Sequence, residues 1–214
     1  MANSERFWFA SKVSQHVRCN VLMITQGIKS RPVYHPLTLD ESGRRHLLVA
    51  DSASFPAEAF AKDGPAAFTT RWKVSRTSQA IPSPAMDAGD GEFRSIQHLF
   101  IALRHRLEQE RMGLRLYAVG TEHFVWDVFG IGSDAGLQRD EIFLYACGSA
   151  ARRIFCNHCR TITAGVTTNV VTCSGCGANL FVRDHFSRRL NAFAGVQVDA
   201  EAPGEIPPVE EIYR

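Results

Sequence analysis

The sequence predicts an α/β protein in which a parallel-sheet domain is followed by a small four-cysteine ribbon and an acidic tail. Strand-like and helix-like segments alternate between residues 44 and 149, which is typical of a parallel sheet. Four of the six cysteines then fall between residues 156 and 176 as two pairs, CNHC and CSGC, with the spacing of a metal site. We therefore expect four parts: an N-terminal arm (1–43), the α/β domain (44–149), the ribbon (150–190) and the acidic tail (191–214).

The composition is that of an ordinary globular protein. Hydrophobic residues make up 45% of the chain and charged residues 21%, which excludes wholesale disorder and collagen-like repeats. The net charge of +2 creates no bulk field that would favour nucleic acid or an anionic membrane. Charged residues interrupt the first segment, and no apolar run approaches the roughly 18 residues of a membrane span. We expect a cytoplasmic protein with neither a membrane nor nucleic acid as its partner.

Four segments of the α/β domain have the composition of strands. Residues 46–50 form a short apolar run that ends in a turn at Asp51, and residues 68–77 alternate with β-branched and aromatic side chains. Residues 114–120 and 140–148 are the third and fourth strands. Residues 81–91 are crowded with proline, aspartate and glycine and are predicted to form a loop.

Three segments are predicted to be helices. Residues 55–62 are expected to form a short helix with Pro56 in its first turn. The clearest helix should begin at Asp90 or Gly91 and end at Gly113. Residues 122–132 should form the third, with Thr121 as its cap. The second helix has apolar residues at three- and four-residue spacing, which places them on one face in the core: Phe93, Ile96, Leu99, Phe100, Leu103 and Leu107.

The two cysteine pairs provide the candidate metal ligands Cys156, Cys159, Cys173 and Cys176. Two-residue spacing lets the backbone present both sulfurs of a pair to one ion about 2.3 Å away. Residues 160–172 between the pairs are predicted to form a β-hairpin that folds the second pair onto the first. Tetrahedral sites of four sulfurs hold zinc or a single iron ion, and we favour zinc in a closed, structural site.

The other cysteines and the histidines are not assigned to a metal or catalytic site. His158 lies inside the first pair and is left out of the ligand set, because such turns ordinarily bind metal through their end residues. Cys19 and Cys147 are interpreted as small apolar residues. No GxGxxG, P-loop, GxSxG or HExxH motif is present, and no histidine forms a convincing acid–base pair, so no catalytic residue is predicted.

Two parts of the chain resemble known families. Residues 114–148 are similar to the last third of the pyridine-nucleotide domain of flavin-dependent ferredoxin reductases, although the nucleotide fingerprint is missing. The motifs CNHC, TTNVVTC, CGANLFVRDHFSRRL and GVQVDAE strongly resemble the DmmA-type subunit of bacterial dimethylamine monooxygenase. This resemblance implies a subunit of an NADPH-using complex that converts dimethylamine to methylamine and formaldehyde. It implies that the haem, flavin, iron–sulfur and NADPH sites lie on a haem-binding oxygenase component and a flavin/iron–sulfur reductase component.

We interpret the chain as a non-catalytic subunit, in which a degenerate reductase-like domain serves as a docking platform and the zinc-stapled ribbon as an adaptor. The basic residues Arg183, Arg188 and Arg189 are the candidate partner surface, because arginine binds carboxylates in bidentate geometry. One alternative is an electron-transfer subunit with iron at the same four cysteines. A nucleic-acid-binding ribbon is a third hypothesis, which the acidic tail opposes.

Overall fold

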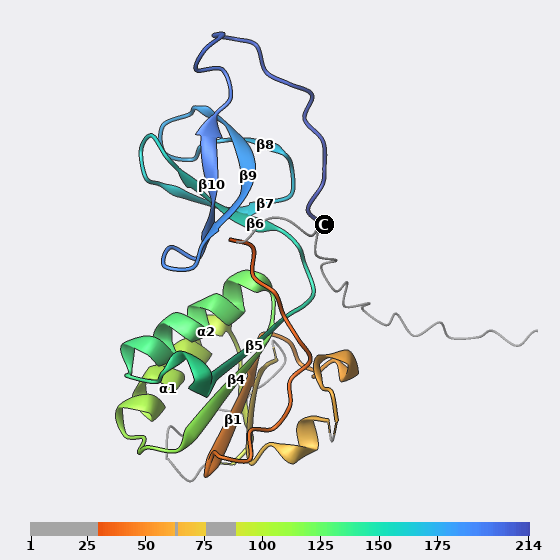
Figure 1. Cartoon of the computed structure of the whole chain (residues 1–214), viewed down its shortest axis with the longest axis vertical. Coiled ribbons are helices and arrows are strands. Elements are labelled where there is room, and N and C mark those ends of the chain that lie inside the picture. Colours follow the sequence, from red (N-terminus) through yellow and green to blue (C-terminus); the bar gives the residue numbers. More distant parts are fainter. Residues whose placement is uncertain (1–29, 63, 76–88) are drawn as a thin grey trace, which may run out of the picture.

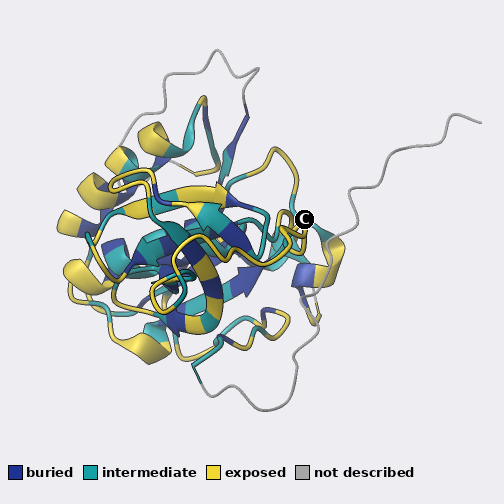
Figure 2. Ribbon diagram, turned by 90° about the horizontal axis from the view of Figure 1, so that it is seen from above, coloured by how far each residue is buried: buried dark blue, intermediate teal, exposed yellow. Residues whose placement is uncertain are grey.

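The computed structural model describes residues 30–62, 64–75 and 89–214, and in it two five-stranded sheets are stacked along the long axis of the molecule (Figure 1). Buried residues gather in the interior, and exposed residues cover the outer surfaces of the helices (Figure 2). The greater part of the expected N-terminal arm, Cys19 included, lies outside the described residues. In the described ranges, no helix combines the length and the apolar character needed to cross a lipid bilayer.

The first sheet is parallel throughout and confirms the predicted α/β class. Its strands lie in the order β3-β2-β1-β4-β5, which is the order of the first five strands of a dinucleotide-binding fold. Strands β1 and β4 are central and almost completely buried, as expected for a sheet covered on both faces. The strand bounds are β1 (Arg45–Ala50), β2 (Thr70–Val74), β3 (Gly91–Phe93), β4 (Leu114–Gly120) and β5 (Ile142–Ala146).

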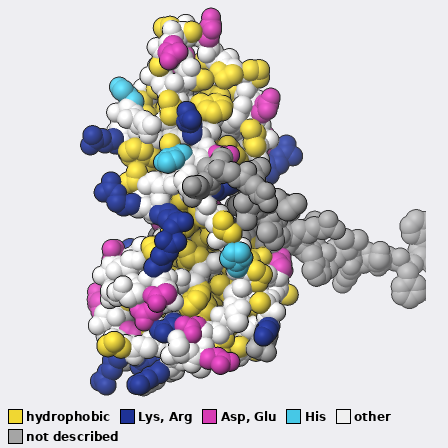
Figure 3. All heavy atoms as spheres, viewed as in Figure 1, with side chains coloured by type: hydrophobic (Ala, Val, Ile, Leu, Met, Phe, Trp, Pro, Cys, Tyr) yellow, Lys and Arg dark blue, Asp and Glu magenta, His cyan; other side chains and the backbone are white. Residues whose placement is uncertain are grey.

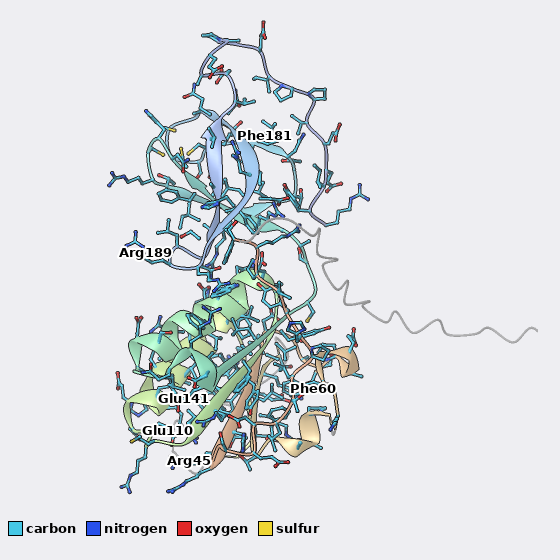
Figure 4. The ribbon with its side chains drawn as sticks, in the orientation of Figure 1. Arg45, Phe60, Glu110, Glu141, Phe181 and Arg189 are labelled. Carbon is cyan, nitrogen blue, oxygen red and sulfur yellow. The ribbon has the colours of Figure 1, made fainter. Side chains whose placement is uncertain are left out.

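Different elements cover the two faces of this sheet. Helices α1 (Ile96–Glu108) and α2 (Glu122–Asp134) cover one face, where Leu99, Leu103 and Phe124 are fully buried. Residues 31–43 and the short 3-10 turns η1 (Ala57–Ala59) and η2 (Pro65–Ala67) cover the other face, on which Phe60 lies (Figure 4). A second hydrophobic core lies on that face, opposite the helices. Its central residues are Leu37, Phe60, Phe68, Tyr117 and Val119.

The helix predicted at residues 55–62 is wrong. Only the single turn η1 forms, because the backbone then extends to pair with the N-terminal segment. The N–H of Leu37 donates to the carbonyl of Ala59 (2.7 Å), and the N–H of Ala61 donates to the carbonyl of Leu37 (2.9 Å). This pairing between distant segments outweighs the local helix preference of the alanines.

The second predicted helix is confirmed, but its ends are different. Phe93 belongs to β3 and pairs with Val74, so it is not part of the helical stripe. The residue that caps α1 is Ser95, whose hydroxyl accepts the N–H of His98 (3.3 Å), and the helix ends at Glu108, well before Gly113. The loop predicted at residues 81–91 lies outside the described residues up to residue 88.

The second sheet forms the ribbon and has the order β7-β6-β10-β9-β8. The predicted hairpin over residues 160–172 is wrong, because β7 pairs with β6 and β8 pairs with β9, at opposite edges of the sheet. Strand β10 lies in the centre, so the sheet continues past residue 190 to Gln197. The strand bounds are β6 (Arg152–Cys156), β7 (Ile162–Val166), β8 (Val170–Thr172), β9 (Asn179–Ser187) and β10 (Ala192–Gln197).

The last residues of the chain run back along the ribbon to the junction between the sheets (Figure 1). The N–H of Ile212 donates to the carbonyl of Thr167 (2.8 Å), and the N–H of Ala150 donates to the carbonyl of Arg214 (2.8 Å). The ring of Tyr213 stacks on the guanidinium of Arg152, at 3.7 Å from its centroid. The tail is therefore docked on the ribbon and does not fold onto the three arginines of the candidate partner surface.

Polar contacts join α2 to the ribbon. The guanidinium of Arg153 donates to both carboxylate oxygens of Asp127 at 2.7 Å each. The side-chain amide of Asn191 donates to the carbonyl of His123 and to Asp127, both at 2.8 Å. The ring of Trp126 lies against Phe186, with centroids 5.4 Å apart. A two-pronged ion pair restrains orientation as well as distance, so these contacts determine how the ribbon sits on α2.

The Asp127→Asn variant tests this junction. We expect it to lower the free energy of unfolding by about 1–2 kcal/mol, because the amide cannot accept both hydrogen bonds from Arg153. The measurement is the urea midpoint of the full chain. Asp134→Asn, at the exposed end of the same helix, is the matched control and should leave the midpoint unchanged. Equal midpoints for both variants would contradict the assigned role.

Candidate metal centre

The first pair of cysteines lies in the turn between β6 and β7, which we call the first knuckle (156–161). Its backbone is closed by two hydrogen bonds: the N–H of Cys156 donates to the carbonyl of Thr161, and the N–H of Arg160 donates to the carbonyl of Cys156, both at 2.9 Å. Arg160 takes a left-handed conformation with a φ of 65°, which turns the chain back into β7. Cys156 and Cys159 are thereby held on the same side of the turn.

The second pair lies in the turn between β8 and β9, the second knuckle (173–178), and repeats this backbone. The N–H of Cys173 donates to the carbonyl of Ala178 (2.8 Å), and the N–H of Gly177 donates to the carbonyl of Cys173 (3.0 Å). Gly177 has a φ of 74° and occupies the position that Arg160 has in the first knuckle. The two turns therefore present their cysteines in equivalent geometry, although they share only the CxxC spacing.

The four sulfur atoms converge between the two knuckles. All four ligand atoms lie within 4.8 Å of one another. The Sγ atoms of Cys156 and Cys176 are 3.9 Å apart, and those of Cys159 and Cys173 are 3.5 Å apart. A tetrahedral ion bound by sulfurs at about 2.3 Å places them roughly 3.8 Å from one another. The separations fit such an ion and are far longer than a disulfide bond of about 2.05 Å.

The site is closed and lies at one end of the ribbon core. The first cysteine of each pair, Cys156 and Cys173, is buried, whereas Cys159 is half-buried and Cys176 is exposed. The side chain of His158 is exposed and is not a member of the cluster, in agreement with its omission from the predicted ligands. A set of four protein sulfurs leaves no coordination position for water or substrate, so the chemistry of these donors fits a structural ion.

Hydrogen bonds favour the thiolate form of two of the four ligands. The side chain and backbone of Thr161 lower the pKa of the Cys159 thiol to about 6. The backbone N–H groups of Cys176 and Gly175 lower the pKa of Cys173, and the distance from the Gly175 nitrogen to its sulfur is 3.4 Å. Thiolates are the species that bind metal, so these hydrogen bonds favour the metal-binding form of Cys159 and Cys173. For Cys176, the backbone hydrogen bond of Ala178 is outweighed by desolvation and the neighbouring cysteine thiols, which raise the pKa to about 11.

Gly175 is a ligand-supporting residue that the sequence did not single out. A Cβ at this position would overlap the side chain of Thr161, which belongs to the opposite knuckle. The hydroxyl of Thr163 and the hydroxyl of Ser174 lie 3.1 Å apart across the same gap. The knuckles therefore touch directly, and only a glycine allows this close approach.

The three arginines of the candidate partner surface are exposed but occupy two places. Arg183 lies on β9, whereas Arg188 and Arg189 lie in the turn between β9 and β10. Figure 4 shows Arg189 at the end of the ribbon that faces the α/β sheet. The guanidinium of Arg188 lies 5.8 Å from the ring centroid of Trp126 on α2. Their role as a partner surface stays a prediction.

A side chain of the protein lies at the edge of the first sheet formed by the carboxyl ends of β1 and β4. The carboxylate of Asp51, after β1, accepts the N–H of Thr121 (2.8 Å) and its hydroxyl (2.7 Å) at the start of α2. Thr121 is the N-cap residue of α2, as the sequence predicted, but its hydroxyl donates to Asp51 and makes no capping hydrogen bond to the helix. Any Cβ on Gly120 would overlap this carboxylate. An internal carboxylate therefore accepts hydrogen bonds at the N-terminus of α2, where a negative charge is stabilising.

Nearby Cys147 follows β5 and is half-buried, and its N–H donates to the carbonyl of Gly120 (2.7 Å). It is distant in sequence from the knuckles and is not part of the sulfur cluster. This residue therefore provides a cysteine control for experiments on the four ligands.

Fold and site together define an α/β protein whose second part is a ribbon shaped for one metal ion. The chain belongs to the DmmA-like family of dimethylamine monooxygenase subunits, because the model of the family's N-terminal domain matches residues 26–142 and that of its C-terminal domain matches residues 153–196. It is 39% identical over 131 residues to the heme-dependent oxidative N-demethylase delta subunit of Ectopseudomonas mendocina (strain ymp), covering 61% of this chain and 70% of that protein. No solved structure matches the chain.

Replacement of Asp51 tests the occupied sheet edge. We expect Asp51→Ala to lower the free energy of unfolding by about 1–3 kcal/mol, because the N–H and hydroxyl of Thr121 lose their acceptor. Asp51→Asn keeps one acceptor oxygen and loses the charge at the helix N-terminus, so it should cost less. Urea unfolding of the three proteins gives the comparison. An alanine variant as stable as the parent would contradict the assigned contacts.

Removal of the metal ion tests the centre itself. We expect a chelator to abolish hydrogen–deuterium exchange protection in β6–β10 and to leave the protection of β1 and β4 intact. The physical reason is that the ion joins the two cysteine turns at one end of the ribbon, where the strands of one turn do not pair with those of the other, whereas the first sheet has no part in the metal site. Elemental analysis must show that the ion has gone. Protection retained in a metal-free ribbon would contradict this expectation.

Proposed function

We propose that this chain is a non-catalytic subunit of an oxidative N-demethylase complex and that its metal-stapled ribbon shapes a docking surface for the other subunits. The observation that carries the proposal is the closed cluster of four sulfurs, in a chain whose relative is named the delta subunit of a heme-dependent oxidative N-demethylase. A closed site supplies structure without an open position for chemistry.

The cofactor, the substrate and the partner subunits in this proposal are taken from the resemblance to DmmA-type subunits. The complex would use NADPH and oxidise dimethylamine to methylamine and formaldehyde, with a haem-binding oxygenase component and a flavin/iron–sulfur reductase component as partners of this chain. Arg183, Arg188 and Arg189 are the residues we assign to partner contact. We place the chain in the cytoplasm, where thiols stay reduced and are available as ligands.

Zinc is the ion we propose, held by Cys156, Cys159, Cys173 and Cys176, and when bound it would link the two hairpins by four metal–sulfur bonds. Other residues of the chain shape the two knuckles and attach the ribbon to the α/β domain. Arg160 and Gly177 turn the two knuckles, and Gly175 permits their contact. Arg153 then attaches the ribbon to α2 through Asp127.

We propose further that the α/β domain is a degenerate relative of the pyridine-nucleotide domain of ferredoxin reductases. Its support is the strand order of the parallel sheet, together with the carboxylate of Asp51 at the start of α2. We keep the division into an N-terminal arm, an α/β domain, a ribbon and an acidic tail, and we extend the ribbon through β10.

A second candidate is electron transfer by an iron ion at the same four cysteines. Cys176 is exposed and Cys159 is half-buried, so an ion at this site would lie near the protein surface. Electron exchange with a partner requires such a position. Iron and zinc fit the same tetrahedral set of sulfurs, so metal content separates the two candidates.

The deciding experiment is elemental analysis and visible spectroscopy of the purified chain, followed by assembly with the remaining subunits. We expect one zinc ion per chain, no visible absorbance, and loss of assembly for Cys156→Ser and Cys173→Ser. Cys147→Ser is the matched control and should assemble normally. A red, iron-bearing chain whose serine variants assemble but do not support electron flow would favour the second candidate. Turnover of dimethylamine by the chain alone would overturn both.

A further inference from the structure

A cavity of about 160 Å³ lies where the two sheets meet, and both parts of the chain line it. The walls include Val33 and Tyr34 from the N-terminal segment, Trp126 and Phe129 from α2, and two arginines at its rim. One arginine, Arg139, precedes β5, and the other, Arg188, comes from the turn between β9 and β10. At this level of the molecule, basic and apolar side chains lie next to one another on the surface (Figure 3). We call this cavity the waist pocket.

The aromatic wall of the waist pocket is held in place by hydrogen bonds. The hydroxyl of Tyr34 donates to a carboxylate oxygen of Glu122 (2.8 Å) and accepts the indole N–H of Trp126 (2.8 Å). Both polar groups of these rings are thus satisfied within the protein. Phe129 packs edge-on against Trp126, with centroids 5.2 Å apart, so aromatic rings from two segments of the chain form this wall.

The rim of the waist pocket is positively charged. Arg139 and Arg188 are both exposed, and neither forms an ion pair within the part of the chain that the structure describes. Other arginines of this chain, such as Arg115 and Arg153, have acidic partners at 2.6–3.0 Å. Two free guanidinium groups beside an apolar wall repel cations and favour carboxylates.

The size of the waist pocket selects the class of ligand. Pockets for cofactors and drug-sized molecules occupy about 300–1,000 Å³, so a dinucleotide does not fit. A space of about 160 Å³ with aromatic walls suits one inserted side chain, which is how protein interfaces bury their central residues. We infer that the waist pocket receives an apolar side chain from an acidic segment of another subunit, whose carboxylates pair with Arg139 and Arg188. This inference rests on the proposed function.

Two other occupants are opposed by the chain itself. The acidic tail is held elsewhere, because its end is paired with Thr167 and Ala150. The sequence of residues 1–29 is basic, with four Lys or Arg residues against the single Glu5, so it does not complement the two rim arginines. A partner with excess acidic residues is the occupant that the charges favour.

The waist pocket also connects docking to the metal centre. Arg188 belongs to the ribbon, so the rim is complete only when the ribbon is folded and attached to α2 through Arg153 and Asp127. Loss of the ion would remove one of the two guanidinium groups from its place. The metal would thus support partner binding from a distance, without contact to the partner.

The first test measures the affinity of the full, metal-bound chain for the remaining purified subunits, at low and at high salt. The double variant Arg139→Glu and Arg188→Glu should weaken binding by about tenfold or more at low salt, and the difference should shrink at high salt. Arg104→Glu, exposed on α1 away from the pocket, is the matched control and should bind normally. Circular dichroism and thermal unfolding establish that all variants are folded.

The outcomes separate this inference from the function it rests on. If the parent chain binds no other subunit, the proposed function fails. If the parent binds and the double variant binds equally well, only the waist pocket is overturned. An equal loss for Arg104→Glu would also overturn it, because the effect would then be general charge repulsion.

The second test identifies the occupant directly. Val33 is 51% exposed at the pocket and can be replaced by a photoreactive benzoylphenylalanine in the assembled complex. Mass spectrometry should find the cross-link in an acidic segment of another subunit. A cross-link within this chain, to a second copy of it, or to a basic segment would overturn the inference, as would no cross-link in a complex that has assembled.

Discussion

Four sulfur atoms converge between two turns at one end of the ribbon sheet, and the metal centre that they form is the constraint on which the shape of the ribbon depends. Strands β7 and β8 lie at opposite edges of the ribbon sheet and do not pair with each other, so no strand pairing closes the gap between the knuckles at this end. Side-chain contacts there are polar and partly exposed. An ion that holds one pair of sulfurs from each turn would close this end of the ribbon, beyond the apolar core that its strands share.

The ribbon in turn depends on the α/β part for its orientation. Arg153 and Asn191 both reach Asp127 on α2, and Trp126 of the same helix contacts the ribbon through Phe186. A charged contact that two guanidinium nitrogens make with one carboxylate resists rotation as well as separation. The surface between the two sheets is therefore a defined shape, and its aromatic and basic residues come from segments far apart in the sequence.

The α/β part has the strand order of a nucleotide-binding sheet, but its ligand edge is filled from within. Asp51 places a negative charge at the N-terminus of α2 and accepts two hydrogen bonds from Thr121 there.

By itself, the sequence determined what repeats at short range: the alternation of strands and helices, the apolar stripe of α1 and the CxxC spacing of the four sulfur ligands. It also identified the family, because the motifs typical of that family are contiguous segments around the knuckles. Only the tertiary structure decided which distant residues come into contact. It pairs Leu37 with Ala59 in place of a predicted helix and puts β10 in the centre of the ribbon sheet. It also brings the carboxylate of Asp51 to α2 and forms the waist pocket. The reason is that the local preference of a residue for helix or strand is worth only a few tenths of a kcal/mol. Strand pairing and burial between distant segments contribute more, and no pattern of neighbouring residues in the sequence reveals them.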